Sequence, residues 1–578
     1  MAFESFPSNR LPRPLAETIN RVLCIDQLES LYAQTRGPGF VRELLDALEV
    51  KIEVAPGDRD KIPATGAVVA VANHPLGILD GVMLADLLTG VRNDVRILTN
   101  RLLGDIPEIS RLCFFIDTEN AGTNGRVLKQ AAMHLRSGGM LLIFPAGEVS
   151  HFDIRKGMIC DPEWNRSAAR LIRMTNARSL PILIRGANGL PFQMLGMVHP
   201  FLRTAALPAE MLNKRGRSIE IRVGRPIDSS RIESLPDDLE ATRFLRLRTE
   251  LLARRLHTVD SRRTAAEHLP VASEQSTELL RREIEALPPE CRMVQETGGM
   301  SVYLAGARSI PLALREIGRL REITFRAAGE GTGEAIDLDR FDQNYLHLFL
   351  WNRAKSEIVG AYRLGDVPML LRQAGRKGLY TDSLFRFKPG FLERLKPALE
   401  LGRSFVRPEY QRQFAPLLLL WKGIVAYVSR HPEYSTLIGA VSVSNQYSAA
   451  SRELIARYFE TRNASTEVRP RRPLHGNLIR RWETAALCSL MSDVEDLAAP
   501  IADLELDGKG IPILVKQYAK LGGKLMAFSV DPQFGNTLDG FVLVDLTQTD
   551  PQTLSRYMGK EEARRFFAWH AAPQPRVA

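Results

Sequence analysis

The sequence predicts two domains, an α/β domain with a mixed sheet flanked by helices and then an α+β domain built on a mixed sheet. The 578 residues exceed what one core usually organises, since a domain mostly holds about 100 to 200 residues. In the first third, apolar strand-like segments alternate with helical ones, which is typical of a sheet covered by helices. A polar segment rich in small residues separates this part from a second half of different pattern. We therefore expect domains at residues 1–256 and 276–578, joined by a linker at 257–275.

The elements of the first domain are expected in the following order. Residues 15–48 carry apolar side chains at helical spacing, which predicts two or three short amphipathic helices. These helices would pack on the sheet or lie on a bilayer. The pattern that follows predicts strands and helices in alternation, with strands at 66–72, 95–98, 140–144 and 180–184 and helices at 82–88 and 127–136.

The second domain opens with a charged helix at 279–287. Strand-like segments then follow between longer helical stretches, at 300–304, 358–362, 403–406 and 437–443. This spacing predicts a mixed sheet rather than a simple βα alternation.

The charge balance is basic. Lys and Arg number 77 against 67 Asp and Glu, a formal net charge of +10, and the pI is near 9.4. The excess favours an acidic partner, which could be nucleic acid, anionic lipid, an acidic carrier protein or a phosphorylated substrate. The densest basic stretch, residues 469–481, lacks aromatic residues for base stacking, so we expect a solvated surface or a contact with lipid or carrier, and no nucleic acid.

The five cysteines lie far apart without a Cys-x-x-Cys pair, which argues against a disulfide scaffold or a thiolate zinc site and favours a reducing compartment. We expect no metal site. No apolar run reaches the roughly 18 residues of a spanning helix, because Lys422 splits the best candidate at 417–428. The first residues also lack the apolar core of a signal peptide. Any contact with a membrane is therefore expected at its surface.

A His and an Asp follow the first predicted strand. His74 comes two residues after Ala72, at the carboxyl end of a strand, where open α/β sheets bind their ligands. Pro75 and Gly77 disfavour a regular helix and allow a loop to bring Asp80 onto the imidazole. Asp80 would then orient His74, whose other ring nitrogen takes a proton from a hydroxyl nucleophile. The alternative is that Asp80 only caps the next helix and His74 fills a loop.

The stretch from Asn73 to Gly81, NHPLGILDG, resembles the first signature of the glycerolipid acyltransferases, the lysophosphatidic acid acyltransferases and their relatives. The resemblance implies that His74 is the general base, that Asp80 is its partner and that Asn73 belongs to the site. One departure is the spacer between His and Asp, which has five residues instead of the usual four.

A second segment, Phe144-Pro145-Ala146-Gly147-Glu148, resembles the Phe-Pro-Glu-Gly-Thr-Arg-Ser loop that holds the acceptor's phosphate in that family. Here the loop lacks the Arg, which removes a phosphate clamp. A phosphate-bearing acceptor is thus less expected, and Glu148 would suit an acceptor that carries a cation. The resemblance covers residues 62–226.

The second half carries a set of short motifs that resembles, in order, the acyl-homoserine-lactone synthases. These GNAT-like enzymes join an acyl chain from acyl carrier protein to an amine. The resemblance implies that one group of residues shapes the N-terminal part of the site and that the segment 400–406 is the central strand beside the acyl thioester; the group comprises Arg321, Phe325, Asp339, Asp342 and Arg363. The alternative is a set of surface ion pairs around a buried strand.

Amine acylation needs a neutral amine and a stabilised oxyanion. Glu400 is the candidate base, directly or through water. Backbone amides near Phe405 and Val406 would steady the oxyanion. Arg403 and Arg407 could hold carrier phosphate or the substrate's carboxylate.

Longer stretches in the second half, including 317–333, 337–345, 400–411 and the segment around Asp539, resemble the ornithine lipid synthases that N-acylate ornithine, and the domain ahead of them resembles the O-acylating partner. This implies a bifunctional acyltransferase. Its C-terminal domain would transfer a 3-hydroxyacyl group from acyl carrier protein to the α-amine of ornithine or a related amino acid. Its N-terminal domain would then esterify the 3-hydroxyl of this lyso-aminolipid, with acyl carrier protein or coenzyme A as acyl donor.

The same resemblance implies a bacterial protein on the cytoplasmic face of the inner membrane, attached to the membrane surface, with no metal or redox cofactor. Two alternatives remain open at this point. One is a single-activity enzyme, either a lysophospholipid acyltransferase or an N-acyl amino acid synthase, whose other domain is inactive. The other is a membrane-surface binding or lytic protein.

Overall fold

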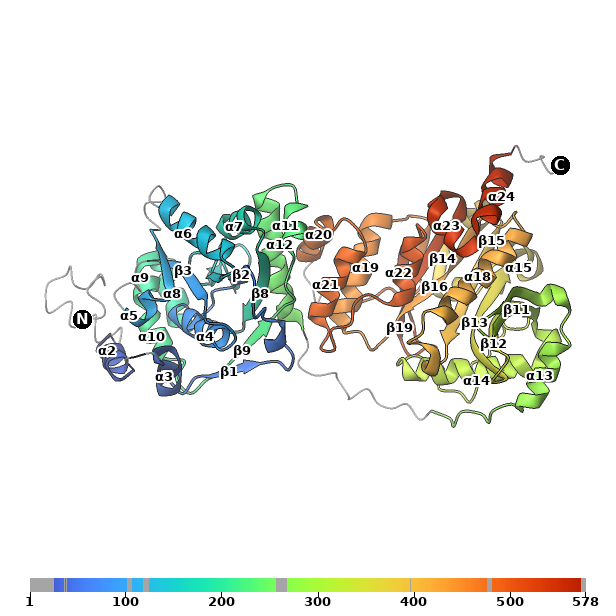
Figure 1. Cartoon of the computed structure of the whole chain (residues 1–578), viewed down its shortest axis with the longest axis horizontal. Coiled ribbons are helices and arrows are strands. Elements are labelled where there is room, and N and C mark those ends of the chain that lie inside the picture. The colour runs from blue at the N-terminus through green and yellow to red at the C-terminus, as the bar shows by residue number, and fades with distance from the viewer. Residues whose placement is uncertain are drawn as a thin grey trace. The chain divides into compact units, whose positions relative to one another are not determined.

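The computed structural model describes residues 25–35, 37, 39–100, 107–117, 124–255, 268–395, 397–475 and 481–572. The chain forms two compact units (Figure 1), one of residues 1–255 with 502–504 and one of residues 256–501 with 505–578. Three expectations fall wholly or partly outside the described residues: the helical segment at 15–24, residues 257–267 of the linker and residues 476–480 of the basic stretch. Residues 268–275 are described, and the amides of Leu269 and Ala272 donate to the carbonyls of Gly333 and Ala335 in the second unit.

The first unit is built on a seven-stranded sheet in the order β1-β9-β8-β2-β5-β3-β4. All neighbours pair in parallel except β8 and β9. The strands are β1 (Lys51–Val54), β2 (Val68–Ala72), β3 (Val95–Asn100), β4 (Cys113–Ile116), β5 (Met140–Ile143), β8 (Arg178–Ile184) and β9 (Ser218–Val223). The four predicted strands are present. The sequence analysis missed β1, β4 and β9, of which β1 and β4 are four residues long and β1 and β9 carry charged residues.

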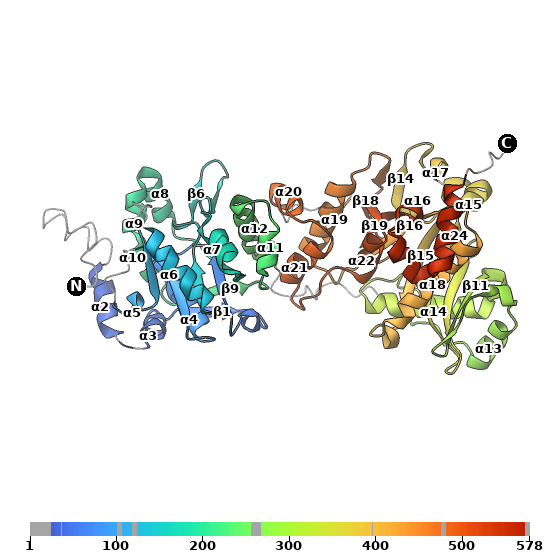
Figure 2. The ribbon, with the colours of Figure 1, turned by 45° about the horizontal axis from the view of Figure 1, so that its top comes forward.

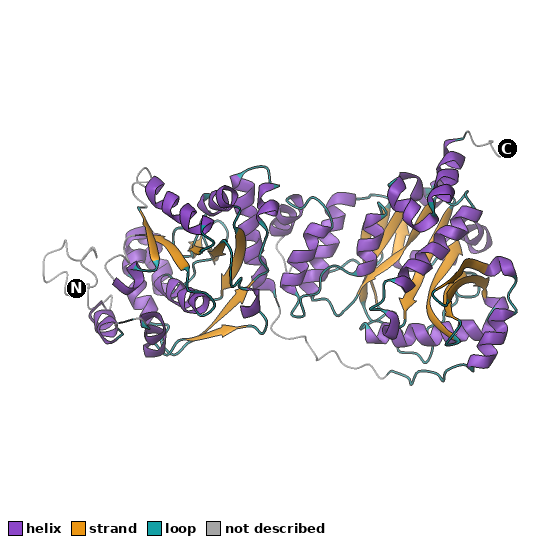
Figure 3. Cartoon of the chain, in the orientation of Figure 1, coloured by secondary structure: helices purple, strands orange, loops and turns teal. Residues whose placement is uncertain are grey.

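Helices cover both faces of this sheet (Figure 3). Val68, Ala70 and Ala72 of β2 share one buried cluster with residues of α3 (Phe40–Ala47) and α4 (Ile78–Thr89). Val69 and Val71 are equally buried and point to the other face, where α7 (Ser167–Thr175) and α12 (Asp238–Leu251) contact the sheet. Burial on both faces explains why β2 and β5 are continuous apolar runs.

The N-terminal amphipathic segment packs on the sheet in its described part. Phe40, Leu44 and Leu45 of α3 and Tyr32 of α2 (Ile25–Gln34) are buried in the same core as β2. The remaining elements of the unit are α5 (Pro107–Ser110), α6 (Gly125–Arg136), the hairpin β6 (His151–Asp153) and β7 (Met158–Cys160), α8 (Leu190–Val198), α9 (Pro200–Ala205), α10 (Leu207–Leu212) and α11 (Ser229–Glu233).

The second unit is built on an eight-stranded sheet in the order β10-β11-β12-β13-β15-β16-β19-β18. All neighbours are antiparallel except β15 and β16, so the sheet is mixed, as predicted. The strands are β10 (Arg292–Thr297), β11 (Met300–Gly306), β12 (Leu346–Asn352), β13 (Glu357–Asp366), β15 (Ala398–Val406), β16 (Thr436–Val443), β18 (Lys524–Asp531) and β19 (Thr537–Asp545). A separate pair joins β14 (Phe385–Phe387) to β17 (Val468–Pro470).

Two long helices lie on opposite faces of this sheet. The α14 helix (Pro311–Ala327) buries its apolar residues with Tyr303 and Phe349. On the other face, Gly423 of α18 (Ala415–Arg430) lies against Val302 and Leu348. The apolar run split by Lys422 is therefore a core helix. None of the helices in the described ranges has the length and apolar character that crossing a bilayer requires.

The other helices of the second part of the chain are α13 (Thr277–Glu285), α15 (Val367–Ala374), α16 (Thr381–Leu384), α17 (Phe391–Arg394), α19 (Ala449–Asn463), α20 (Arg481–Ser489), α21 (Glu495–Leu504), α22 (Ile513–Lys520), α23 (Pro551–Met558) and α24 (Lys560–Ala571).

The strands β15 and β16 separate part of the way along. They pair at four positions, from Ala398 with Thr436 to Leu401 with Gly439. Beyond Leu401 the strand bulges, because Arg403 adopts a left-handed backbone with φ of 48° and its register against β13 shifts. The amides of β15 after Leu401 therefore have no ladder partner in β16.

We predict that Gly439→Ala destabilises the second unit. A Cβ at Gly439 would lie 2.3 Å from the carbonyl oxygen of Leu401, so the two strands must move apart at the last pair they form. Such overpacking typically costs about 1 to 3 kcal/mol and should lower the thermal midpoint in a calorimetric scan. Gly402→Ala is the control, because a Cβ there meets no atom within 4 Å. Equal midpoints for the two variants would contradict the prediction.

Candidate active sites

The first site forms where β2 ends and α4 begins. His74 lies in the loop between them, and its Nδ1 is 2.9 Å from Oδ2 of Asp80, in the first turn of α4. Asp80 is fully buried, whereas His74 is partly exposed. The structure thus brings together the two residues that the sequence predicts as a pair.

Asp80 also caps the helix. Its Oδ2 accepts hydrogen bonds from the amides of Leu76 and Gly77, at 2.8 and 3.0 Å. Burial raises the pKa of Asp80, and the contact with His74 and these two amides oppose that rise. One carboxylate therefore caps α4 and also holds the imidazole, so capping is not its only contact.

The imidazole of His74 is fixed in orientation. Its ring packs against Phe144, with the centroids 4.4 Å apart. Because Nδ1 faces the carboxylate, Nε2 is the nitrogen that can accept a proton from a substrate. Within the described ranges, no residue hydrogen-bonds Nε2.

Asp161 connects this loop with the loop that follows β5. Its Oδ1 accepts from the amide of His74 at 3.2 Å and from the hydroxyl of Ser150, and its Oδ2 accepts from Nε1 of Trp164 at 2.9 Å. The amide of Ser150 in turn donates to the carbonyl of His74 at 2.8 Å. Asp161 is a buried positioning residue that lies 87 residues from His74 in the chain, and no local pattern announced it.

The loop after β5 is held by backbone and ion-pair contacts. Gly147 has φ of +70°, which favours glycine. The carbonyl of Pro145 accepts from the amide and the side chain of Asn165, at 2.8 and 2.6 Å. Glu148, which the sequence analysis reserved for a cationic substrate, pairs with Nη2 of Arg203 at 2.5 Å. The α9 helix thus supplies an arginine to this loop, and the charge of Glu148 is already matched within the chain.

Asn73 joins two strands. Its side-chain amide donates to the carbonyl of Ile184 at 2.9 Å and accepts from the amide of Ile184 at 2.7 Å. Both polar ends of Asn73 therefore connect the end of β2 with the end of β8, which holds His74 at the edge of the sheet.

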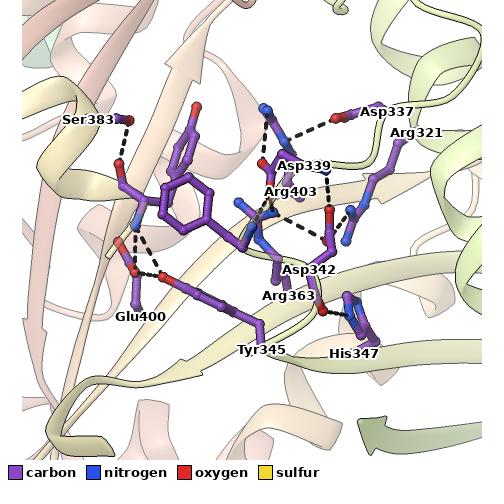
Figure 4. Close-up of polar contacts among 12 residues, drawn as sticks. Arg321, Asp337, Asp339, Asp342, Tyr345, His347, Arg363, Ser383, Glu400 and Arg403 are labelled. Atoms are coloured by element: carbon purple, nitrogen blue, oxygen red, sulfur yellow. Dashed lines mark hydrogen bonds and ion pairs between the residues drawn. The ribbon is translucent and has the colours of Figure 1, made fainter. Parts of the chain in front are cut away.

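In the second unit, three arginines converge on three aspartates (Figure 4). Arg321 Nη1 lies 2.8 Å from Asp342, and Arg363 Nη1 lies 2.6 Å from Asp339 and 3.3 Å from Asp342. Arg403 reaches Asp337 at 3.4 Å and Asp339 at 3.6 Å. We call these six residues the Arg–Asp network.

The Arg–Asp network is interior. Arg321 and Arg363 are fully buried, so the alternative of surface ion pairs is wrong. Burial alone would raise the pKa of Asp342, but Arg321 and Arg363 lower it far below its usual value. Buried charges persist when they are paired in this way.

Glu400 lies beside the Arg–Asp network on β15 (Figure 4). Its buried carboxylate accepts hydrogen bonds from the hydroxyl of Tyr345 and from the amides of Tyr380 at 3.2 Å and Thr381 at 2.7 Å. These donors fix Tyr380 where its ring packs on the guanidinium of Arg403, 5.1 Å from the ring centre. Neither tyrosine was among the predicted site residues.

Three more acidic residues lie near Arg403. Asp539 on β19 is paired in register with Ser442 of β16 and Ser529 of β18, and Asp531 accepts from the hydroxyl of Tyr380 at 3.0 Å. Burial raises the pKa of Asp539 well above its usual value, and the neighbouring Asp531 and Glu330 raise it further. Burial raises the pKa of Glu330 to about 7, against a hydrogen bond with Ser442 and the charge of Arg403. Glu330 was not predicted as a site residue.

The other predicted residues of this half lie at the edges of the site. Phe405 and Phe325 belong to the core under α14, and Phe325 packs edge-on against Phe534 at 4.9 Å. Val406 ends β15 opposite Gly360. Arg407 pairs with Glu357 at 2.7 Å and with Glu409, and these partners lie outside the Arg–Asp network. In the described part of the chain, no group of three or more His, Cys, Asp or Glu residues could hold a metal ion.

Comparison with known protein families gives two matches. Residues 44–259 match the Acyltransferase family and residues 320–422 match the Acetyltransferase (GNAT) domain. The matches confirm an acyltransferase domain in the first half and a GNAT domain in the second.

The chain is also similar to curated N-acyltransferases and to a curated O-acyltransferase. A glycine N(alpha)-acyltransferase of Bacteroides thetaiotaomicron is 32% identical over 284 residues, 46% of this chain and 83% of that protein. An L-ornithine N(alpha)-acyltransferase of Brucella abortus is 28% identical over 46% of this chain and 92% of its own length. A lyso-glycine lipid O-acyltransferase of Phocaeicola vulgatus is 27% identical over 38% of this chain and 80% of its own length.

Among solved structures, the 1-acyl-sn-glycerophosphate (LPA) acyltransferase PlsC of Thermotoga maritima matches 42% of this chain and 81% of its own, at 18% identity and a TM-score of 0.25.

We predict that Glu330→Gln changes how stability depends on pH. A carboxyl whose pKa rises from 4.5 to about 7 on folding contributes stability below pH 4.5 that is lost as the pH rises through 7. The difference in thermal midpoint, variant minus wild type, should therefore be more positive at pH 8 than at pH 5. The exposed Glu334→Gln is the control and should show no such change. A difference independent of pH would contradict the raised pKa.

Proposed function

We propose that the chain, which belongs to the family of the glycine N(alpha)-acyltransferases, is a bifunctional acyltransferase that makes aminolipids. The second unit would acylate the α-amine of ornithine or a related amino acid with a 3-hydroxyacyl group, and the first unit would esterify the 3-hydroxyl. The observation that carries the proposal is that one chain contains two separate candidate sites. One is the His74–Asp80 pair, and the other is Glu400 with the Arg–Asp network.

The geometry of the first site suits a hydroxyl acceptor. The 3-hydroxyl oxygen attacks the carbonyl carbon of the acyl thioester, and its proton goes to Nε2 of His74. Asp80, 2.9 Å from Nδ1, stabilises the imidazolium that results. The bond from carbon to sulfur then breaks. His74 gives the proton to the sulfur, which leaves as the thiol, and the imidazole is neutral again.

The acceptor proposed here carries no phosphate. The loop at 144–148 lacks the family's arginine, and Arg203 stands near it as the partner of Glu148. A lyso-aminolipid offers a carboxylate to Arg203, and ornithine would add an ammonium for Glu148. The pair would thus open and bind both charges of the acceptor's head group.

The geometry of the second site suits an amine acceptor. β15 has no register partner in β16 beyond Leu401, so an amide of this stretch that does not pair with β13 can donate to the oxyanion of the tetrahedral intermediate. Glu400 is the base proposed from the sequence, directly or through water. Glu330 is a second candidate, because its pKa near 7 matches what a general base needs at neutral pH.

The partners follow from the chemistry. The donor is an acyl carrier protein, an acidic partner that the net charge of +10 would attract. The lyso-aminolipid passes from the second site to the first, at the cytoplasmic face of a bacterial inner membrane. Glycine is a second candidate for the amino acid, favoured by the 32% identity to the glycine enzyme against 28% to the ornithine enzyme.

We predict the lipids that appear when the protein is expressed in a host without aminolipids. Mass spectrometry of extracted lipids should show a diacylated amino acid lipid for the wild type, a mono-acylated amide for His74→Ala and no aminolipid for Glu400→Gln. The mass of the head group identifies ornithine or glycine. The exposed pair His431 and Glu433, 3.6 Å apart, offers matched controls in His431→Ala and Glu433→Gln, which should resemble the wild type.

Other patterns would overturn parts of this proposal. An ester-free amide from the wild type would mean an inactive first site. Complementation of a lysophosphatidic acid acyltransferase defect without any aminolipid would mean a phospholipid enzyme. Lipid binding without turnover would mean a surface-binding protein.

A second prediction separates the two candidate bases. If Glu330 accepts the amine's proton, the N-acylation rate of the wild type should rise with pH through about 7, and Glu330→Gln should lose this rise together with about 100-fold to 10,000-fold in rate. Glu400→Gln would then be slow but keep the rise, as expected for a residue that positions Tyr380. The opposite assignment, in which only Glu400→Gln abolishes the rise, would make Glu400 the base.

A further inference from the structure

The α8 helix presents apolar side chains to solvent. Only Phe192 and Gln193 of its nine residues are buried. A surface helix of a globular protein normally turns its apolar stripe to the core. Here five large apolar side chains are exposed instead: Leu190 (78%), Met194 (63%), Leu195 (36%), Met197 (56%) and Val198 (76%).

The β6–β7 hairpin extends this surface. Phe152 and Ile154 are exposed by 38% and 76%, and the amide of Phe152 donates to Oε1 of Gln193 at 2.8 Å, which joins the hairpin to α8. Figure 2 shows α8 and β6 next to each other. Across the described residues, seven of the fifteen exposed large apolar side chains lie on these two elements. We call these seven residues the α8 patch.

Exposed basic side chains border the α8 patch at the tip of the hairpin. The hairpin tip places the exposed Arg155 and Lys156 directly after Ile154. The one acid at the tip, Asp153, is bound by the amides of Arg155 and Lys156 and by the Lys156 ammonium at 3.5 Å. Two acids also lie near α8, but each is paired with a basic side chain: Glu210, which accepts from the amide of Gly189 at 3.0 Å, pairs with Lys214, and Glu148 pairs with Arg203. An apolar surface with basic residues at its border fits an anionic bilayer better than an acidic or apolar protein face.

The α8 patch adjoins the first site. On the inner side of α8, Phe192 packs with Val149 and Ala206, and Val149 belongs to the loop after β5. The next residue, Ser150, donates its amide to the carbonyl of His74. The helix that carries the exposed apolar residues is therefore in direct packing contact with the loop that positions the catalytic His74.

We propose that the α8 patch inserts into the anionic leaflet of a bilayer and that this insertion delivers a lipid acceptor from the membrane to His74. The identity of that acceptor rests on the proposed function, whereas the binding of the α8 patch to lipid does not. The insertion buries Met194, Met197 and their neighbours among acyl chains, and Arg155 and Lys156 contact lipid phosphates. The acceptor's hydroxyl then reaches Nε2 while its acyl chain stays in the leaflet.

The test is vesicle binding of the full chain. Sedimentation with vesicles of phosphatidylglycerol and phosphatidylethanolamine should show at least about tenfold weaker binding for the double variant Met194→Ser/Met197→Ser. The control is Met133→Ser/Met174→Ser, whose methionines on α6 and α7 are exposed by 59% and 53%. The control should bind within about twofold of the wild type.

The reaction gives a second measurement. O-acylation of a long-chain lyso-aminolipid embedded in vesicles should fall in parallel with binding in Met194→Ser/Met197→Ser. O-acylation of a short-chain acceptor dissolved below its critical micelle concentration should remain unchanged, since His74 and its loop are intact. If the wild type esterifies neither acceptor, the proposed O-acylation is wrong. The sedimentation experiment would still show whether the α8 patch binds lipid.

Two results would overturn the inference. One is equal vesicle binding by the wild type and Met194→Ser/Met197→Ser. The other is a wild-type dimer in light scattering that this variant converts to monomer without loss of vesicle binding, which would mean that a second copy of the chain covers the α8 patch.

Discussion

Both sites depend on a buried carboxylate that accepts hydrogen bonds from two backbone amides. Burying a carboxylate is costly unless donors surround it. Asp80 accepts hydrogen bonds from the amides of Leu76 and Gly77 at the start of α4. Glu400 accepts hydrogen bonds from the amides of Tyr380 and Thr381 at the start of α16. In each case the same carboxylate also binds a side chain of the candidate site, His74 or Tyr345. The loop and the site are therefore formed by one set of contacts and cannot vary independently.

In the second unit the Arg–Asp network extends this constraint across the sheet. Arg321 comes from α14, Arg363 from β13 and Arg403 from the bulge of β15, and the three aspartates lie on the single segment 337–342. Pairing of the charges ties the helix, two strands and the segment together in the interior. The bulge at Arg403 turns its guanidinium toward the network and at the same place separates β15 from β16. The ion pairs of Arg403 and the separation of the two strands therefore occur at the same backbone irregularity.

The proposed reaction needs an acidic carrier, a lipid intermediate and two different nucleophiles. A separate feature of the molecule suits each requirement. The basic net charge suits the acidic carrier, and the exposed apolar surface beside the first site suits the lipid intermediate. The imidazole in one unit and the carboxylates in the other suit the two nucleophiles. The two chemistries differ in the proton that must be removed. A hydroxyl keeps its proton until attack, which suits His74, whereas an ammonium must lose one beforehand, which suits a carboxylate with a pKa near 7.

The sequence by itself determined the two acyltransferase domains, most of the long buried strands and the pairing of His74 with Asp80. These depend on local pattern, since period, turn residues and a six-residue spacing act within one stretch of chain. It could not supply Asp161, the partnership of Glu148 with Arg203, or the tyrosines that bind Glu400. It also missed the inner strands β9, β12 and β19 and the edge strands β1, β4, β10 and β18. Only the tertiary structure decided these features, because strand order and helix packing bring together residues far apart in the chain. Asp161 and His74 lie 87 positions apart and meet only once the sheet has placed their loops side by side.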